Sequence, residues 1–209
     1  EGKSCRCVVT NNRSLSEHFE TGHPLYAEEV YESVSRWIRH CLRMHSENCS
    51  PNPMWQDFEL HCIDCEALEV IALPMGAQYL ALSYVWGAST VSENCGSLAN
   101  APAVVKDSIV VTLSLSLRFL WVDRYFIDQK NAAERHRQIA NMGSIYASAI
   151  LTIIAAGGPH ADVGLPGVSS CQCDKNTDFQ LGPYSFRRTF SQPGDAVKET
   201  KWSTRGWTY

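Results

Sequence analysis

The chain has 209 residues, a formal net charge of −4, and 44% apolar and 19% charged residues, which fits one large globular domain with or without an extension. The longest Lys/Arg run is the pair Arg187 and Arg188, so neither nucleic acid nor an anionic membrane surface is expected as the main partner. No apolar stretch reaches the roughly 18 residues of a membrane-spanning helix, and the first residues lack the apolar run of a secretory signal.

The nine cysteines admit two readings, a secreted disulfide scaffold or reduced thiols inside the cell. An odd cysteine count and a chain large enough to form an apolar core favour reduced thiols, because disulfide scaffolds are typically small. A cytoplasmic protein is therefore expected.

The first third of the chain predicts an extension before the main domain. Residues 1–23 are polar without a sustained period, which predicts a mobile lead-in. Apolar residues recur at helical spacing over 28–44, with Glu28 and Glu29 at the positive end of the predicted helix. Residues 58–73 look extended. Residues 24–76 thus form a helix and a connector, and residues 77–209 form the domain.

The middle of the chain alternates between strands and helices. A buried strand is predicted over 79–87 and closed by Gly87, a second strand ends at 120–123, and an apolar run over 149–156 predicts a central strand. A helix is predicted between the last two, over 131–149. Its inner stripe consists of Ile139, Met142, Tyr146 and Ala149. This order argues for a βαβ unit and a parallel sheet.

Residues 107–120 fit two structures. Strict alternation of apolar and polar residues from Val111 to Phe119 predicts a strand. Alternatively, Asp107 and Ser108 cap a helix. Its buried face would consist of Ile109, Leu113, Leu117 and Leu120. Periodicity alone leaves both open.

Four ordered segments resemble the signature of the heterokaryon-incompatibility (HET) domain family of filamentous fungi. They are YLALSYVWG at 79–87, LWVDRYFIDQ at 120–129, the set Glu134, Arg135, Gln138, Ile139, Met142, Ile145 and Tyr146, and RGWTY at 205–209. The chain departs from the family at Phe126, where Cys is usual, and at Ser116, where Gly is frequent.

The resemblance implies a fold and a function. It implies a helix over 107–117 and, through a distant similarity to TIR domains, a flavodoxin-like parallel sheet flanked by helices. It also implies self/non-self recognition, with programmed cell death triggered when HET domains associate with each other or with other incompatibility-signalling proteins. A TIR-like NAD hydrolase is the enzymatic alternative. The family's fourth segment usually continues into Gln-Glu, whereas this chain stops at Tyr209. If that Glu is the hydrolytic residue, we expect this chain alone to be inactive as an NAD hydrolase.

A candidate ligand cleft lies at the carboxyl ends of the first two predicted strands, where crevices open in parallel α/β sheets. An aromatic wall beside carboxylates suits a nucleotide or a sugar, with NAD as a possible substrate. The candidate catalytic residues are Glu134 and Asp128, and the candidate binding residues are Ser83, Tyr84, Trp86, Gly87, Asp123, Gln129 and Arg135. The alternative is structural: the aspartates buttress a turn, and Glu134 pairs with Arg137 or Gln138.

Thiol and imidazole groups upstream suggest zinc as a second ligand, in a zinc-stabilised structural domain. The candidate ligands are Cys41, His45, Cys49, Cys62 and Cys65. On one continuous helix Cys41 and Cys49 would lie about 12 Å apart, so the helix must end near His45 for both to share an ion. Buried free thiols are the alternative.

Overall fold

The computed structural model describes residues 6–9, 27–45, 59–87, 98–126, 132–168, 179–181, 184–189 and 197–204. Its helices are α2 (Ala27–Met44), α4 (Ala103–Ser114), α5 (Asp123–Phe126) and α6 (Ala132–Ser148), with short 3-10 helices η2 (Leu98–Asn100), η3 (Ala161–Val163) and η4 (Lys201–Thr204). Its strands are β1 (Arg6–Val9), β2 (His61–Asp64), β3 (Glu69–Ala72), β4 (Tyr79–Tyr84), β5 (Phe119–Val122), β6 (Leu151–Ala155), β7 (Phe179–Leu181) and β8 (Tyr184–Thr189). None of the helices in these ranges is long and apolar enough to cross a membrane.

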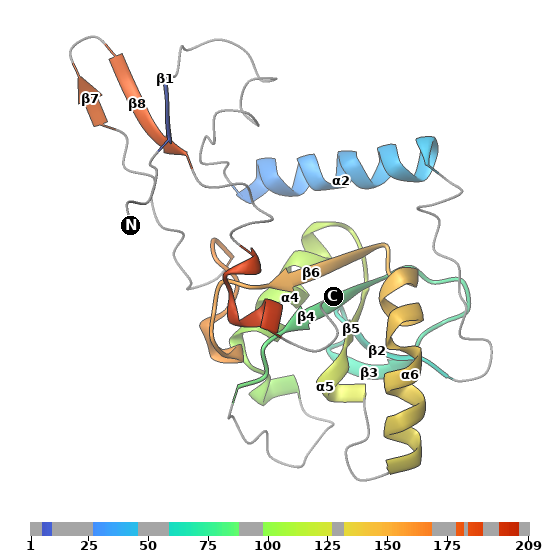
Figure 1. Cartoon of the computed structure of the whole chain (residues 1–209). Helices are drawn as coiled ribbons and strands as arrows, with labels where there is room; N and C mark the ends of the chain where they lie inside the picture. Colours follow the sequence, from blue (N-terminus) through green and yellow to red (C-terminus); the bar gives the residue numbers. More distant parts are fainter. Residues whose placement is uncertain are drawn as a thin grey trace.

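Three parallel strands, β5, β4 and β6, form one side of the main sheet (Figure 1). β4 pairs in parallel with β5 on one side and with β6 on the other, in a register that places Tyr79 beside Phe119 and Leu80 beside both Leu120 and Leu151. The expectation that segments 79–87 and 120–123 lie side by side, with their carboxyl ends at one edge, is confirmed.

The complete sheet is mixed, so the expectation of an all-parallel sheet is wrong at one edge. The strand order is β3-β2-β5-β4-β6, and β2 runs antiparallel to both β3 and β5. The β2–β3 hairpin comes from the stretch predicted to be a connector, and it extends the same sheet as β4. Because β2 and β3 are antiparallel, a tight turn is enough to join them, whereas the parallel strands β4, β5 and β6 need helical crossover connections.

The strand predicted to be central, β6, is the opposite edge of this sheet among the described residues. No residue of β6 is fully buried, and the side chain of Ile154 is 46% exposed. A continuous apolar run therefore marks an edge strand here rather than one covered on both faces.

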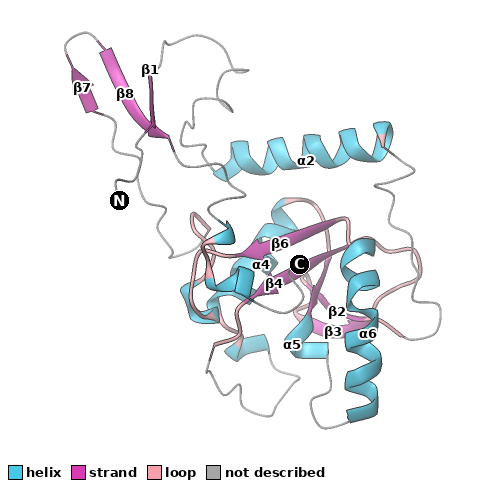
Figure 2. Cartoon of the chain, viewed as in Figure 1, coloured by secondary structure: helices cyan, strands magenta, loops and turns pink. Residues whose placement is uncertain are grey.

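Helices cover both faces of the sheet (Figure 2). Side chains alternate along β4, so Leu80, Leu82 and Tyr84 pack into one core with α4. Tyr79 and Ala81 point the other way and pack with Trp121 and α6. This alternation is the expected period of a strand, and it makes β4 part of two separate cores.

α4 resolves the ambiguity over 107–120 in favour of the helix. Two polar residues are tolerated in its buried face because the Ser108 and Thr112 hydroxyls donate to the carbonyl oxygens four residues earlier, at 2.7 Å each. The helix begins after Pro102, so Asp107 and Ser108 do not cap it. Leu113, expected in the buried face, is 42% exposed.

The end of α4 explains the residue preference at position 116. The amide of Leu117 donates to the Thr112 carbonyl, and the amide of Ser116 donates to the Leu113 carbonyl, the two bonds of a Schellman motif. Ser116 has φ +58°, in the left-handed region that favours glycine. The frequent glycine of the HET family at this position thus has a backbone reason.

α6 confirms the predicted helix but not its whole inner stripe. Met142 and Ile145 are buried under the sheet, and the Tyr79 hydroxyl donates to the Ile145 carbonyl. Ile139, expected in the stripe, is 46% exposed. Ile139 therefore adds apolar surface outside the core midway along α6.

Two further elements lie outside the main sheet. α2 confirms the helix predicted upstream, and it packs on the α4-side core through Tyr31 and Val34 (Figure 1). β1, within the segment expected to be a lead-in, pairs antiparallel with β8 in a separate sheet of order β1-β8-β7.

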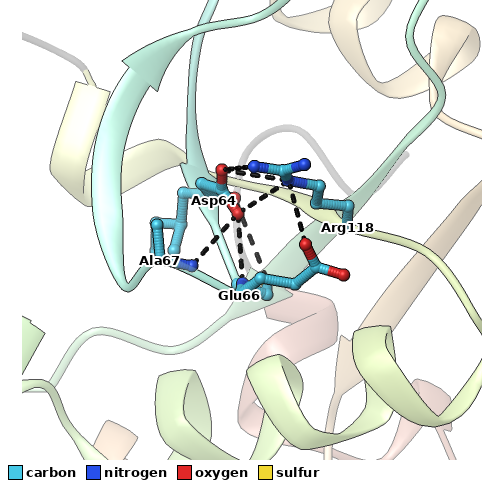
Figure 3. A network of polar contacts seen from close by, with 6 residues as sticks. Asp64, Glu66, Ala67 and Arg118 are labelled. Carbon is cyan, nitrogen blue, oxygen red and sulfur yellow. Dashed lines mark hydrogen bonds and ion pairs between the residues drawn. The ribbon is translucent and has the colours of Figure 1, made fainter.

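A buried carboxylate fixes the β2–β3 hairpin to the start of β5 (Figure 3). Asp64, whose side chain is 4% exposed, receives hydrogen bonds from Arg118 at 2.6–3.0 Å and from the amides of Glu66 and Ala67. The Arg118 hydrogen bonds hold the pKa of Asp64 below its ordinary value of 3.8, and the two amides act in the same direction against the effect of burial.

We predict that Ser116→Gly raises the free energy of unfolding by up to about 1 kcal/mol, because glycine removes the left-handed strain. Ser114→Gly is the matched control: it is the last residue of the same helix, and the substitution is expected to destabilise the protein by roughly 0.5 kcal/mol or less. Urea unfolding measures both. A loss of stability in Ser116→Gly would contradict this account of the helix end.

We also predict that Asp64 links stability to pH. Because its pKa is lower in the folded chain, its contribution is complete above the unfolded value of 3.8 and is lost as the pH falls through the folded value. Unfolding curves from pH 6 downward should show Asp64→Asn much less stable at the start and converging with the wild type in acid.

Glu66→Gln is the control for this titration. Glu66 also contacts Arg118, at 3.4 Å, but its side chain is 61% exposed and solvent screens the pair. Glu66→Gln should change stability little at any pH. A gap between Asp64→Asn and the wild type that stays constant down to strong acid would contradict the linkage.

Candidate functional site

The connections that leave β4 and β5 depart to opposite faces of the sheet. The chain after β4 leads to α4 on one face, and the chain after β5 leads through α5 to α6 on the other. Ligand crevices of open α/β sheets form at such points, outside the carboxyl ends of the strands. Trp86 and Asp123 lie here, each just beyond its strand.

These side chains bind one another across the edge of the sheet. The Trp86 indole Nε1 donates to Asp123 Oδ1 at 3.0 Å, and the same oxygen accepts from the Arg124 amide at 2.7 Å. The Arg124 guanidinium lies 5.7 Å from the centre of the Trp86 ring and contacts the Trp86 carbonyl at 3.4 Å. Asp123 has no exposed surface. The geometry matches the structural alternative for Asp123, in which the carboxylate buttresses a turn.

The other candidate binding residues of the first strand diverge. Ser83 is 4% exposed and lies on the α6 side, whereas Tyr84 is 1% exposed in the α4-side core. Gly87 has φ +75°, and a Cβ there would lie 2.8 Å from the His160 Cβ, so glycine is required both by conformation and by space. The structure therefore brings Trp86 and Asp123 together and separates them from Ser83.

The candidate residues further along remain predictions. Asp128 and Gln129 lie outside the described residues. Glu134 and Arg135 belong to the first turn of α6, but their side chains are outside the described part of the chain. Their assignment to catalysis or binding is untested.

A cavity of about 250 Å³ lies beside Ser83, on the α6 face of the sheet. Its lining comes from β4, α6, β6 and η4, and consists of Ser83, Met142, Gly143, Tyr146, Thr152, Ile154 and Trp202. The Trp202 indole Nε1 donates to the Ser83 hydroxyl at 2.9 Å. None of these lining residues is charged. Hydroxyls and aromatic rings suit a neutral ring or a sugar, but they supply no carboxylate for hydrolysis.

Sequence reasoning identified only Ser83 of this lining as a ligand residue. Trp202 is 119 residues away in the chain, so no local pattern connects the two. Tyr146 belongs to the third signature segment, and its hydroxyl donates to the Leu82 carbonyl at 3.4 Å. The third signature segment was therefore the sequence feature that could have indicated α6 as one wall of this cavity.

The candidate zinc ligands fall into separate elements. Cys41 and His45 lie at the end of α2, Cys62 in β2 and Cys65 in the following turn, while Cys49 is outside the described residues. In the described ranges no three His, Cys, Asp or Glu side chains gather as a metal site. Burial raises the pKa of both Cys62 and Cys65 to about 12, which disfavours the thiolates that zinc binds. Zinc stays a prediction.

We predict that Trp86→Phe lowers the free energy of unfolding by about 1–3 kcal/mol, because it leaves the buried Asp123 carboxylate without one donor. The ring that Arg124 contacts is retained. The same substitution in an Asp123→Asn background should cost less, and the double-mutant cycle from urea unfolding isolates the pair. Equal costs in both backgrounds would contradict the coupling.

Comparison with known proteins agrees with the signature segments. The family model described as heterokaryon incompatibility protein (HET) matches residues 79–209, more than half of the chain. The match starts at the first residue of β4 and contains α4, β5, α6 and β6. No curated protein and no solved structure matches the chain. The chain belongs to the heterokaryon incompatibility (HET) family.

Proposed function

We propose that the chain acts in the cytoplasm of a fungus as a self/non-self recognition module, and that association of its HET domain with other incompatibility proteins triggers programmed cell death. The observation that carries the proposal is the family match over 79–209, which includes the whole β4–α4–β5–α6–β6 unit. The heterokaryon incompatibility context comes from the family, and the death response is the proposed output.

The geometry supports a module that signals through its surface. Signature residues bind one another inside the fold, as in the pairs Tyr79–Ile145, Tyr146–Leu82 and Trp86–Asp123. Residues used in this way hold the domain together and are not displayed to partners. Exposed apolar side chains lie instead on the outer faces of the flanking helices: Val110 and Leu113 of α4 are 44% and 42% exposed, and Ile139 of α6 is 46% exposed.

Expression in a filamentous fungus tests the proposal. We expect the wild type to cause growth arrest and uptake of a vital dye, and the double variant Val110→Glu, Leu113→Glu to abolish both while its circular dichroism stays native. Charges on this face oppose association, and both side chains are more than 40% exposed. Lys106→Glu, one turn earlier and also exposed, is the matched control and should remain active.

Two results would contradict the proposal. One is a wild-type chain that accumulates in the fungus without any death response. The other is a charge-bearing α4 variant that remains as toxic as the wild type, which would remove this face from the signalling surface.

The cavity beside Ser83 favours a second candidate, nucleotide binding with TIR-like cleavage of NAD. Its size suits one ring or sugar of a dinucleotide: an apolar protein cavity of about 150 Å³ already holds benzene. Gly143 lines it without a side chain, and a Cβ there meets nothing within 4 Å. Larger side chains at 143 are therefore expected to fill the space without disturbing α6.

Saturation-transfer NMR with NAD, combined with chromatography for released nicotinamide, tests this candidate. We expect binding that Gly143→Leu removes and that His136→Leu, exposed two turns earlier on the same helix and not part of the cavity lining, retains. Release of nicotinamide should further require Glu134. Absence of NAD binding to the wild type, or equal binding to Gly143→Leu, would end this candidate and leave the signalling proposal intact.

A further inference from the structure

Ser83 has a buried hydroxyl that accepts a hydrogen bond but donates none to the described residues. Its side chain lines the cavity on the α6 face of the sheet, and the residue is 4% exposed. The Ser83 Oγ accepts the Trp202 indole N–H at 2.9 Å, and an indole N–H cannot accept a proton in return. A buried donor without an acceptor is costly, so a molecule that brings an acceptor into the cavity is favoured.

Trp202 also restricts the direction in which Ser83 can donate. To keep the 2.9 Å bond, a lone pair of the Ser83 Oγ must face the indole Nε1, so the hydroxyl proton points away from Trp202. Accepting one hydrogen bond also polarises the O–H group, which strengthens the bond that it donates. Trp202 is therefore a positioning residue for the Ser83 donor.

The floor of the cavity adds a second hydroxyl and no charge. β6 pairs with β4 in a register that places Ile154 beside Ser83 and Thr152 beside Ala81. Ala81 packs on the α6 side, and Thr152 lines the cavity on this same side. No lining residue is charged, so a charged molecule would lose hydration here without gaining an ion pair. The lining therefore selects uncharged molecules.

The walls of the cavity suit a flat ring. Tyr146 and Trp202 supply aromatic rings, and Gly143 leaves room because a Cβ there meets nothing within 4 Å. The Tyr146 ring is held edge-on to Trp121 at 5.2 Å, and its hydroxyl donates to the Leu82 carbonyl. The volume of about 250 Å³ exceeds the roughly 150 Å³ that already holds benzene, so a ring with one polar substituent fits.

We propose that this cavity binds an uncharged aromatic ring that carries a hydrogen-bond acceptor, with the Ser83 hydroxyl donating to that acceptor and Trp202 holding the hydroxyl in position. As a subsite for one ring of NAD, the inference rests on the second candidate function. As a pocket for a free ring, it rests on the cavity alone. Benzamide is the probe, because it is an uncharged ring with a carbonyl oxygen. Benzoate has nearly the same shape with a negative charge, and toluene lacks the acceptor.

NMR titration of the full chain with these probes tests the chemistry. Benzamide should bind with saturation, and benzoate should bind about tenfold or more weakly because its charge has no partner. Ser83→Ala should weaken benzamide binding by about three- to tenfold, the effect of one neutral hydrogen bond, and leave toluene binding unchanged. Ser144→Ala, next to Gly143 on α6 but outside the lining, is the matched control and should bind benzamide like the wild type.

Three results of this titration overturn the proposal. One is a wild type that does not bind benzamide, and another is a Ser83→Ala variant that binds it as tightly as the wild type. The third is an equal loss of toluene and benzamide binding in Ser83→Ala, which would mean that Ser83 shapes the cavity and does not bind the acceptor.

The indole signal of Trp202 tests where the probe binds. The chain has six tryptophans, and the Trp202 N–H signal is the one missing from Trp202→Phe. Benzamide should shift this signal, because the probe binds the same hydroxyl that the indole N–H contacts. Trp202→Phe keeps an aromatic ring without the N–H, so it should bind benzamide more weakly than the wild type and toluene equally. Gly143→Leu should remove both the binding and the shift. A shift that persists in Gly143→Leu would place the probe elsewhere and contradict the proposal.

The pocket and the NAD candidate fail separately. If benzamide binds through Ser83 but NAD neither binds nor is cleaved, the pocket stands and the second candidate function is wrong. If NAD binds but benzamide does not, the ring pocket is wrong and the NAD candidate stands.

Discussion

Burial of β4 on both of its faces is the constraint on which the rest of the structure depends. No residue from Tyr79 to Tyr84 exposes more than 4% of its surface. A strand buried in this way needs a neighbour on each side and a helix layer above and below, because its backbone must be paired and its side chains face two cores. The parallel partners β5 and β6 meet the first need, and α4 and α6 meet the second.

The HET signature is best understood through this strand. Its segments meet around β4 by hydrogen bonds between distant residues: Trp86 binds Asp123, and the Tyr79 hydroxyl binds the Ile145 carbonyl. Asp123, which follows a strand as catalytic carboxylates often do, is fully buried and bound by its neighbours. These signature residues therefore act mainly to stabilise the fold of the domain. Exposed apolar side chains outside the two cores lie on α2, α4 and α6.

Local patterns predicted the helices α2 and α6 from the helical spacing of their apolar residues, and the strands β4 and β5 from short apolar runs. The alternation from Val111 to Phe119 favoured a strand where the structure has a helix followed by a turn. Thr112 is buried with its hydroxyl bonded to the Ser108 carbonyl, whereas Ser114 and Ser116 are exposed. The β2–β3 hairpin and the edge position of β6 depend on which segments pair with each other. The periodicity of apolar residues within one segment does not show this pairing. For the same reason the wall of the cavity formed by Trp202 was not foreseen, whereas Ser83 was.

Amide hydrogen exchange followed residue by residue tests the role of β4 most directly. If this strand is the element that the other layers require, its amides exchange only when the whole domain unfolds, and their protection matches the global free energy of unfolding. The amides of α2 and of the β6 edge should open at lower cost. Exchange in β4 as fast as in those peripheral elements would mean that the sheet opens at its centre, and the other layers would then not depend on this strand.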